Sequence, residues 1–354
     1  MALRREDIPK DVMRVLERGA VIPAHPLALD SRRRLDPRRQ RALSRYYIAA
    51  GSGGLAVGVH TTQFAIREAG LYETVLRLAA EEMDAARRPL MRIAGVIGGT
   101  EQAVREAETA VSLGYHAGLL SLAAFKGAGE EEIVTHCQAV ARVIPLVGFY
   151  LQPAVGGVVL SASFWARFCR IENVVAVKIA PFNRYRTLDV VRGLVAAGAE
   201  RRVMLYTGND DHILLDLVTP FSVRRGGEEV TVRIRGGLLG HWSVWTKRAV
   251  ELLDRIHTSA EKTSAVSDEL LKLDSEITDC NAAFFDVPNE FRGCIAGCHE
   301  VLRRQGLLEG VWCLDPEEGL SPGQSAEIDR VYRDYPHLND DDFVRAHRDE
   351  WLRP

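Results

Sequence analysis

Short apolar runs alternate with longer segments of helical periodicity over the first two thirds of the chain. The apolar runs lie near residues 19–24, 54–60, 91–97, 117–122, 145–151, 174–179, 202–207 and 236–242. Runs of this kind are typical of strands that are buried on both faces. Between the first seven runs, apolar residues recur with the period of an α-helix at 36–50, 67–86, 101–113, 130–143, 161–170 and 182–197.

Eight alternations of strand and helix predict an α/β fold in which a parallel sheet closes into a (β/α)8 TIM barrel. An open, doubly wound sheet is the alternative, and it usually carries a glycine-rich phosphate turn after its first strand. Here the first strand continues into Pro23-Ala-His-Pro26, which does not resemble a phosphate loop. The barrel is therefore the better interpretation.

The alternation of apolar runs and helical segments is interrupted twice towards the C-terminus. Arg224-Arg-Gly-Gly227 is a turn signal and the next residues alternate like a strand, which predicts a small hairpin. After residue 243 the pattern is helical at 243–258, 260–278 and 291–304, and an irregular tail with one helix near 325–333 follows. We expect a barrel over 1–243 with a hairpin insertion near 222–235, and a C-terminal helical region with an irregular tail over 244–354.

Composition excludes several classes of protein. The 354 residues are 47% hydrophobic and 26% charged, with a formal net charge of -3, so neither nucleic acid nor an anionic membrane is an expected partner. No run reaches the roughly 20 apolar residues of a membrane span, and the N-terminus lacks the apolar core of a signal peptide. A cytoplasmic location is expected by default.

Six scattered cysteines do not form a disulfide framework in a chain of this length. Cys294, Cys298 and His299 would share one face of a helix, which makes a metal site conceivable. Neither a CxxC pair nor a second histidine completes it, so buried free thiols and no metal are expected.

Catalytic groups of a barrel lie at the C-terminal ends of its strands. One such strand, Val174-Val-Ala-Val-Lys-Ile-Ala180, carries Lys178 within an apolar run. Burial lowers the pKa of a lysine, and a neutral amine can attack a carbonyl group to form a Schiff base. The alternative is a lysine that reaches water from a strand end. Other strand ends bring a phenol, hydroxyls and carboxylates to the same mouth: Thr61, Thr62, Tyr150, Gly208, Asp210 and Asp211.

In these segments the chain resembles the dihydrodipicolinate synthase / N-acetylneuraminate lyase family of class I aldolases. The matching pieces are Gly51-Ser-Gly-Gly-Leu-Ala-Val-Gly-Val-His-Thr-Thr62, Gly148-Phe-Tyr-Leu-Gln-Pro153, Val174–Ala180 and Gly208-Asn-Asp-Asp211, in the family's order. The resemblance covers roughly residues 18–310. It implies a (β/α)8 barrel with a C-terminal helical extension, usually a homotetramer, and no cofactor.

The resemblance also implies roles for single residues. Lys178 would condense with the keto group of a 2-oxo acid such as pyruvate, and Tyr150 would relay protons beside the imine. Thr61 and Thr62 would hold the substrate carboxylate. Asp210 and Asp211, which follow Gly208 in the same substrate-binding segment, would accept hydrogen bonds from a polyhydroxylated tail. The structural alternatives are a core aromatic for Tyr150, strand-end capping for the threonines, and charges at a helix N-terminus for the aspartates.

The chain departs from the family pattern at several positions. The usual Thr-Thr-Gly-Glu loop has Gln63 and Phe64 instead, and Phe125 stands where the synthases carry a tyrosine lent across the subunit interface. Val155 stands where the synthases use an arginine to bind a second carboxylate. These differences argue against aspartate-semialdehyde condensation, the dihydrodipicolinate synthase activity itself.

Four further polar residues lie near predicted strand ends. His25 and His60 are alternative acid/base groups, although structural histidines are the other interpretation. Asn183 and Arg184 either bind a substrate anion or begin a solvated helix.

The sequence thus predicts a Schiff-base lyase, aldolase or hydro-lyase that acts on a sugar-derived 2-oxo acid without metal or organic cofactor. It also predicts a homo-oligomer, a dimer or tetramer. The alternative is a catalytically idle homologue that binds a 2-oxo acid without turnover. A Lys178–Tyr150 pair across an open pocket would favour the enzyme, and a mouth plugged by Phe64 or Phe125 the idle protein. A metal-dependent barrel hydrolase lacks the His-x-His and carboxylate ligands that it needs.

Overall fold

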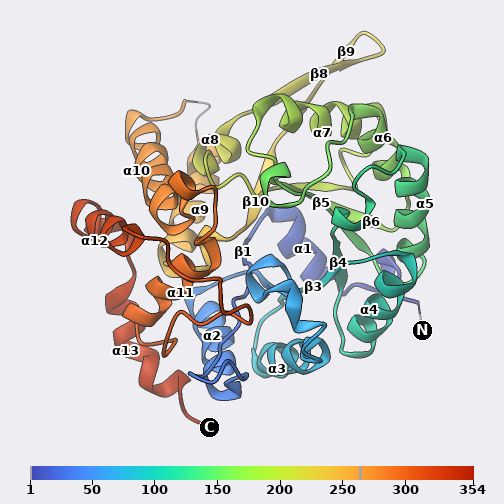
Figure 1. Cartoon of the computed structure of the whole chain (residues 1–354). Coiled ribbons are helices and arrows are strands. Elements are labelled where there is room, and N and C mark those ends of the chain that lie inside the picture. The colour runs from blue at the N-terminus through green and yellow to red at the C-terminus, as the bar shows by residue number, and fades with distance from the viewer. Residues whose placement is uncertain (1, 263–264) are drawn as a thin grey trace.

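Eight parallel strands form a closed barrel in the computed structural model, which describes residues 2–262 and 265–354 (Figure 1). They follow one another around the barrel as β1 (Val21–Pro23), β10 (Ile234–Leu239), β7 (Met204–Thr207), β6 (Val174–Ile179), β5 (Leu146–Tyr150), β4 (Ala117–Leu120), β3 (Met91–Val96) and β2 (Gly54–Val57). A parallel bridge between Ala24 and Ala56 joins β1 and β2, the first and last strands of this order, and so closes the barrel. Next to it, His25 N–H donates to Ala56 O at 2.8 Å. The predicted (β/α)8 barrel is confirmed, and each predicted apolar run overlaps one of its strands.

Helices follow most of the strands and cover the outside of the barrel (Figure 1). They are α2 (Pro37–Ala50), α3 (Tyr72–Ala85), α4 (Thr100–Ser112), α5 (Glu130–Ala141), α6 (Ala162–Arg170), α7 (Arg184–Ala196) and α8 (Ile213–Val218). Three of them begin at side chains that accept a backbone N–H, namely Asp36, Ser161 and Asn183. These caps satisfy N–H groups that have no partner inside the helix and fix where the helix begins.

The strands separate two apolar layers. Ala176 and Ala180 of the β6 segment pack inside the barrel, whereas Val177 and Ile179 pack outwards against the helices. Successive side chains of a strand point to opposite faces, so Lys178 shares the inner face with the two alanines. This alternation places the amine inside the barrel.

An N-terminal helix, α1 (Lys10–Arg18), was not singled out by the sequence pattern. Its Val12 and Leu16 pack into the inner layer, and Tyr206 donates a hydrogen bond to Leu16 O at 2.8 Å. At the end of this helix a Cβ atom on Gly19 would lie 1.9 Å from Arg235 O, so only glycine fits there. The helix packs against β3 and β10 and fills one end of the barrel interior.

A two-stranded antiparallel hairpin, β8 (Phe221–Arg225) and β9 (Glu228–Val232), projects from the barrel before β10 (Figure 1). Gly226 and Gly227 form its turn, and both have positive φ angles (59° and 90°). Two central residues with positive φ match the right-handed twist of the paired strands. The hairpin lies in the region where the sequence predicts one.

The described residues of the C-terminal region form the helices α9 (Thr246–Lys262), α10 (Asp268–Phe284), α11 (Cys294–Arg304), α12 (Gln324–Asp334) and α13 (Asp341–Trp351). Residues 263–264 of the helix predicted at 260–278 lie outside the described residues. Helix α13 was not predicted, because the acidic and proline-containing tail was interpreted as irregular. Short 3-10 turns complete the fold at Arg5–Asp7, His60–Thr62, Phe64–Ile66, Ala123–Phe125, Pro153–Val155, His241–Ser243, Val287–Asn289 and Pro336–Leu338.

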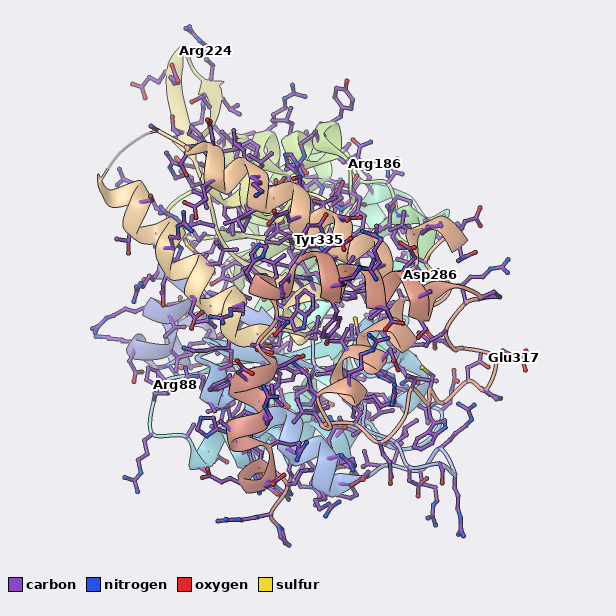
Figure 2. The ribbon with its side chains drawn as sticks, turned by 90° about the vertical axis from the view of Figure 1, so that its left-hand side faces the viewer. Arg88, Arg186, Arg224, Asp286, Glu317 and Tyr335 are labelled. Carbon is purple, nitrogen blue, oxygen red and sulfur yellow. The ribbon has the colours of Figure 1, made fainter. Side chains whose placement is uncertain are left out.

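Figure 2 shows the C-terminal helices lying across one side of the barrel. The buried carboxylate of Asp340 links them to the barrel, since it accepts hydrogen bonds from Tyr46 Oη and Gln305 Nε2, each at 2.7 Å. It also accepts Lys247 N–H at 2.9 Å. Three segments that are distant in sequence are thereby tied to one carboxylate. Within the described residues, no helix is both long and apolar enough to cross a membrane.

Candidate active site

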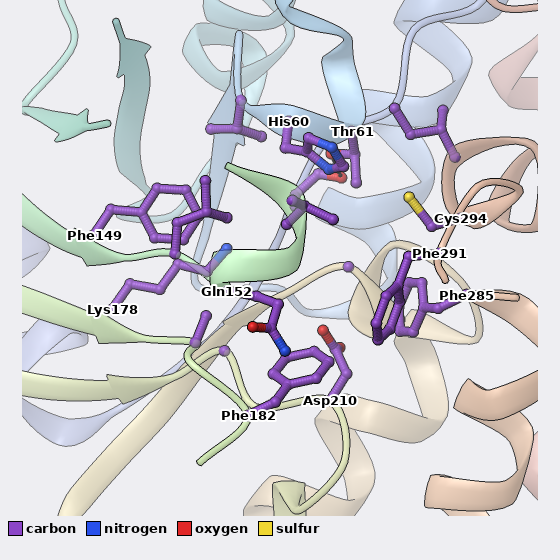
Figure 3. A pocket seen from close by; sticks show the side chains of 18 residues that line it. His60, Thr61, Phe149, Gln152, Lys178, Phe182, Asp210, Phe285, Phe291 and Cys294 are labelled. Atoms are coloured by element: carbon purple, nitrogen blue, oxygen red, sulfur yellow. Dashed lines mark hydrogen bonds between the residues drawn. The ribbon is translucent and has the colours of Figure 1, made fainter. Parts of the chain in front are cut away.

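A cleft with about 710 Å³ of free space lies at the C-terminal ends of the strands (Figure 3). Its polar side chains are His60, Thr61, Gln152, Lys178 and Asp210. Most other lining side chains are apolar: Ala24, Val59, Phe149, Leu151, Val155, Ala180, Phe182, Phe285, Phe291 and Ile295, together with Cys294, Gly208 and Gly240. The cleft therefore has a small polar floor and a mainly apolar wall.

Lys178 lies at the floor of this cleft and is only 8% exposed. Its Nζ atom lies 4.4 Å from the centroid of the Phe149 ring and makes no hydrogen bond or ion pair with a described residue. Burial lowers the pKa of Lys178 to about 8, although the nearby Asp210 raises it in part. A useful fraction of the amine is therefore neutral near pH 7–8, as Schiff-base formation requires.

Gly208, which follows β7, makes room for this lysine. A Cβ atom at Gly208 would lie 2.7 Å from Lys178 Cε and 2.8 Å from Ala180 Cβ. These distances are shorter than van der Waals contact, so a larger residue would displace the lysine side chain. The sequence placed Gly208 in the substrate-binding segment, and its contacts in the structure are with the lysine stem.

Asp210 follows Gly208 by two residues and also faces the cleft, with 9% exposure. Its Oδ1 accepts His241 N–H at 3.1 Å, whereas Oδ2 has no hydrogen-bond partner among the described residues. Burial raises the pKa of this carboxyl to about 7, against the opposing effects of the His241 N–H and the Lys178 amine. Asp210 can therefore hold or release a proton near neutral pH.

The 3-10 turn His60–Thr62 brings two of its residues to the cleft. Thr61 donates its hydroxyl to Ala24 O at 2.7 Å, and the N–H groups of His60 and Thr61 have no acceptor among the described residues. Burial, and secondarily the Lys178 charge, lowers the pKa of His60 to about 4. The imidazole is therefore neutral near pH 7, and it lines the cleft while its ring packs edge-on against Phe64.

Thr62 and Asp211 lie outside the cleft. Thr62 is fully buried, accepts the N–H groups of Gly58 and Val59, and donates to His25 O at 2.6 Å. It thus holds the turn that carries Thr61. Asp211 is exposed, and its carbonyl oxygen accepts a hydrogen bond from Thr278 Oγ1 at 3.1 Å. Of the predicted pairs Thr61/Thr62 and Asp210/Asp211, only the first member of each lines the cleft with Lys178.

Tyr150 does not lie beside Lys178, where the sequence led us to expect it. Its neighbour Phe149 pairs with Lys178 across β5 and β6 and lines the cleft, so Tyr150 points to the opposite face of β5. Its hydroxyl donates to Leu160 O and accepts Leu160 N–H, each at 3.2 Å, and its ring packs on Trp165. The expected Lys178–Tyr150 pair is not formed, and Tyr150 is a core aromatic with a satisfied hydroxyl.

The structure also places the residues at which the chain departs from the family pattern. Val155 lines the cleft, whereas Phe125 packs on His136 with ring centroids 4.3 Å apart, and Phe64 packs edge-on against His60. Neither phenylalanine plugs the mouth. Gln63 has a positive φ of 66°, the conformation that glycine adopts most easily, and its Oε1 accepts Leu314 N–H at 2.6 Å.

Three other polar candidates have structural partners. The ring nitrogens of the fully buried His25 lie 2.8 Å from Pro26 O and 2.9 Å from Ser44 Oγ. Asn183 caps α7, and Arg184 forms an ion pair with the buried Asp216. These contacts support the structural interpretations weighed for them from the sequence.

Metal chemistry has no ligand set in the part of the chain that the structure describes, where no group of three or more His, Cys, Asp and Glu side chains is arranged to hold an ion. Cys294 reaches the cleft, but burial raises the pKa of its thiol to about 12, so it stays protonated. His299 is fully buried in α11 and does not line the cleft.

The outer wall of the cleft comes from residues that the sequence did not single out. Phe182 follows β6, whereas Phe285, Phe291 and Ile295 belong to the C-terminal region. Figure 3 shows Lys178 and Phe149 on one side of the cleft and Phe285, Phe291 and Cys294 on the other. Their contribution depends on how the C-terminal helices pack on the barrel, for which the sequence pattern contains no signal.

A (β/α)8 barrel with a buried lysine facing a cleft at its strand ends has the architecture of a class I aldolase. The chain belongs to the dihydrodipicolinate synthetase family, whose model matches residues 18–221, more than half of its length. The resemblance stated from the sequence is thereby confirmed, and membership supports an enzyme of the class I aldolase or lyase type. No curated protein sequence matches the chain.

Solved structures of this family share the fold at low sequence identity. CdNal from Clostridium difficile, solved with mannosamine, is 17% identical with a TM-score of 0.72, covering 90% of this chain and 99% of that one. The chloride-inhibited dihydrodipicolinate synthase from Acinetobacter baumannii, solved with pyruvate, is 18% identical with a TM-score of 0.73 and the same coverage. N-acetylneuraminate lyase from Fusobacterium nucleatum is 17% identical with a TM-score of 0.70, again over 90% and 99%.

Proposed function

We propose that this protein is a Schiff-base-forming lyase or aldolase that acts on a 2-oxo acid through an imine on Lys178. The observation that carries the proposal is the buried amine at the floor of the cleft, which has a lowered pKa and forms no ion pair with any described residue. Its neutral form attacks the C2 carbonyl, and loss of water leaves a protonated imine. That imine accepts electrons when a neighbouring bond of the substrate breaks.

Asp210 is the proposed acid/base group in place of Tyr150. The titratable residues that line the cleft are His60, Lys178, Asp210 and Cys294, and the thiol stays protonated. A general acid/base works best when its pKa lies near the operating pH, which Asp210 satisfies. Its unpartnered Oδ2 is the oxygen that would exchange a proton with the substrate.

The substrate carboxylate is proposed to bind at the 60–62 turn. The N–H groups of His60 and Thr61 find no acceptor there among the residues that the structure describes, and donors of this kind suit an anion. Neutral His60 adds a ring nitrogen near the same place. Gln152 and Thr61 are the remaining polar side chains available to orient the substrate.

Trapping of the imine tests the proposal. Pyruvate plus borohydride is expected to add irreversible mass to the peptide that contains Lys178, and Lys178→Ala should abolish the adduct. Lys126→Ala, at an exposed lysine outside the cleft, is the matched control. Absence of an adduct in the wild type, or its persistence in Lys178→Ala, would refute the proposal.

One observation favours the alternative of an idle 2-oxo-acid-binding homologue, namely the position of Tyr150 away from the cleft. An idle protein would form the adduct but release no product from any 4-hydroxy-2-oxo acid. The predicted homo-oligomer, a dimer or tetramer, stays a prediction that light scattering can test.

A further inference from the structure

We infer that the outer half of the cleft selects a substrate whose leaving aldehyde carries an aromatic or bulky apolar group, an inference that rests on the proposed Lys178 chemistry. In this proposal Lys178 and the 60–62 turn hold the 2-oxo acid end, and Asp210 faces the C4 hydroxyl. The remaining wall is formed by Phe182, Phe285, Phe291 and Ile295. This composition argues against the sugar-derived substrate expected from the sequence, because a polyhydroxylated tail would lose its water and find few hydrogen-bond partners besides Gln152 and Asp210.

Two rings of this wall are placed by unusual backbone. Phe182 has a φ of 51° and Phe291 a φ of 67°, both in the left-handed region that bulky residues rarely adopt. The two rings meet edge to face, with centroids 6.0 Å apart. Strained backbone of this kind is kept where surrounding structure enforces it, and it concentrates at functional sites. Here it turns two aromatic side chains from separate segments towards one another at the cleft.

Each strained segment is anchored by a buried polar side chain. Phe182 N–H donates to Asn209 Oδ1 at 3.0 Å, and Asn209 Nδ2 donates in turn to Asp216 at 2.9 Å. In the other segment, Phe291 N–H donates to Asp286 O at 3.1 Å, and Asp286 Oδ2 accepts Gly293 N–H at 3.0 Å. The aromatic wall is thus held in place before any substrate binds.

The bound substrate is a 4-hydroxy-2-oxo acid joined to Lys178 as an iminium ion. Asp210 takes the proton of the C4 hydroxyl, the C3–C4 bond breaks, and its electron pair moves into the iminium group to give an enamine. The C4 atom leaves as an aldehyde whose substituent lies against Phe182 and Phe291. Protonation at C3 and hydrolysis of the imine then release pyruvate and restore the amine.

Two probes that share the same 4-hydroxy-2-oxo acid part but differ in the group at C4 distinguish the substrate classes. One 4-hydroxy-2-oxo acid carries a phenyl group at C4 and the other a dihydroxyethyl group, and pyruvate release is measured for both. We expect kcat/KM to be at least about tenfold higher for the phenyl probe. Equal values, or a preference for the dihydroxyethyl probe, would overturn the inference while leaving the imine chemistry intact.

Substitutions of the aromatic residues that form the wall provide a second test of the inference. Phe291→Ala and Phe182→Ala should lower kcat/KM for the phenyl probe by at least about tenfold, while borohydride trapping with pyruvate, which does not reach the wall, stays within about twofold. Phe291→Leu and Phe182→Leu preserve the fold if the alanine variants do not. Phe125→Ala, which removes a ring outside the cleft, is the control and should leave the preference unchanged. An unchanged preference in the wall variants contradicts the inference, and the absence of any Lys178 adduct would overturn both it and the proposed function.

Discussion

Lys178 and Asp210 face the same cleft from the ends of the paired strands β6 and β7, and each changes the pKa of the other. Burial disfavours the charged form of both groups, so it lowers the pKa of the amine and raises that of the carboxyl. Their mutual attraction opposes both shifts. The neutral and the charged pair are therefore close in free energy near neutral pH, which suits a site that must pass a proton and release an amine.

Asp210→Asn should separate imine formation from turnover. Without the carboxylate, the pKa of Lys178 falls below about 8, because Asp210 is the group that raises it. The pH midpoint of borohydride trapping should move to lower pH, while turnover drops by about 10²–10⁴-fold for want of the acid/base group. Glu108→Gln, at an exposed carboxylate of α4 outside the cleft, should change neither quantity. A midpoint that moves to higher pH would contradict the assigned electrostatics.

Tyr150→Phe should have little effect on chemistry. The lost hydroxyl is bonded to Leu160 rather than to the cleft, so its removal is expected to cost about 1 kcal/mol of folding free energy. Denaturant unfolding measures that cost, and trapping with pyruvate measures the chemistry. A loss of adduct formation in a folded Tyr150→Phe protein would show that the phenol takes part after all.

Gly208→Ala should slow imine formation by displacing the Lys178 side chain, although the lysine itself is unchanged. The added methyl group would lie 2.7 Å from Lys178 Cε, so the amine must move from its place in the cleft. We expect trapping to slow by at least about tenfold, because small displacements of a reacting group are costly. Gly319→Ala, where a Cβ atom meets nothing within 4 Å, is the matched control. Equal trapping rates in the two variants would disprove the positioning role.

Lys178→Met should stabilise the protein at neutral pH. In the unfolded chain the amine has a pKa near 10.5 and in the folded protein about 8, so the buried site binds fewer protons between these values. The cost of holding the ammonium group is present below pH 8 and is relieved as the pH rises from 8 towards 10.5. We expect the variant to gain about 1–3 kcal/mol at pH 7, with the gap to the wild type narrowing at pH 10 in urea unfolding. A variant less stable than the wild type at pH 7 would indicate that the buried ammonium group does not lower the free energy of unfolding.

The barrel was predictable because every strand is an apolar run between amphipathic segments, and Lys178 stood out as a charge within such a run. The strand-end rule then selected Thr61 and Asp210, both of which line the cleft. It did not assign the face of β5, because Leu146-Val-Gly-Phe-Tyr150 is apolar on both sides and has no alternation to indicate direction. Tyr150 and Phe149 were therefore indistinguishable in the sequence.

The apolar wall of the cleft was beyond sequence reasoning for a different reason. Phe285 and Phe291 belong to a helical region whose packing on the barrel depends on buried links such as Asp340 with Tyr46. A periodic pattern gives the buried face of a helix but not the element that covers it. The left-handed backbone at Phe182 and Phe291 also runs against residue preference, and local rules are expected to fail where strain is kept.

Because the reactive groups sit on barrel strands and much of the apolar wall comes from the C-terminal region, the two tasks are encoded in separate stretches of the gene. Exchanging the 285–295 segment alone offers a route to reprogramming selectivity while the lysine and its neighbours are inherited unchanged.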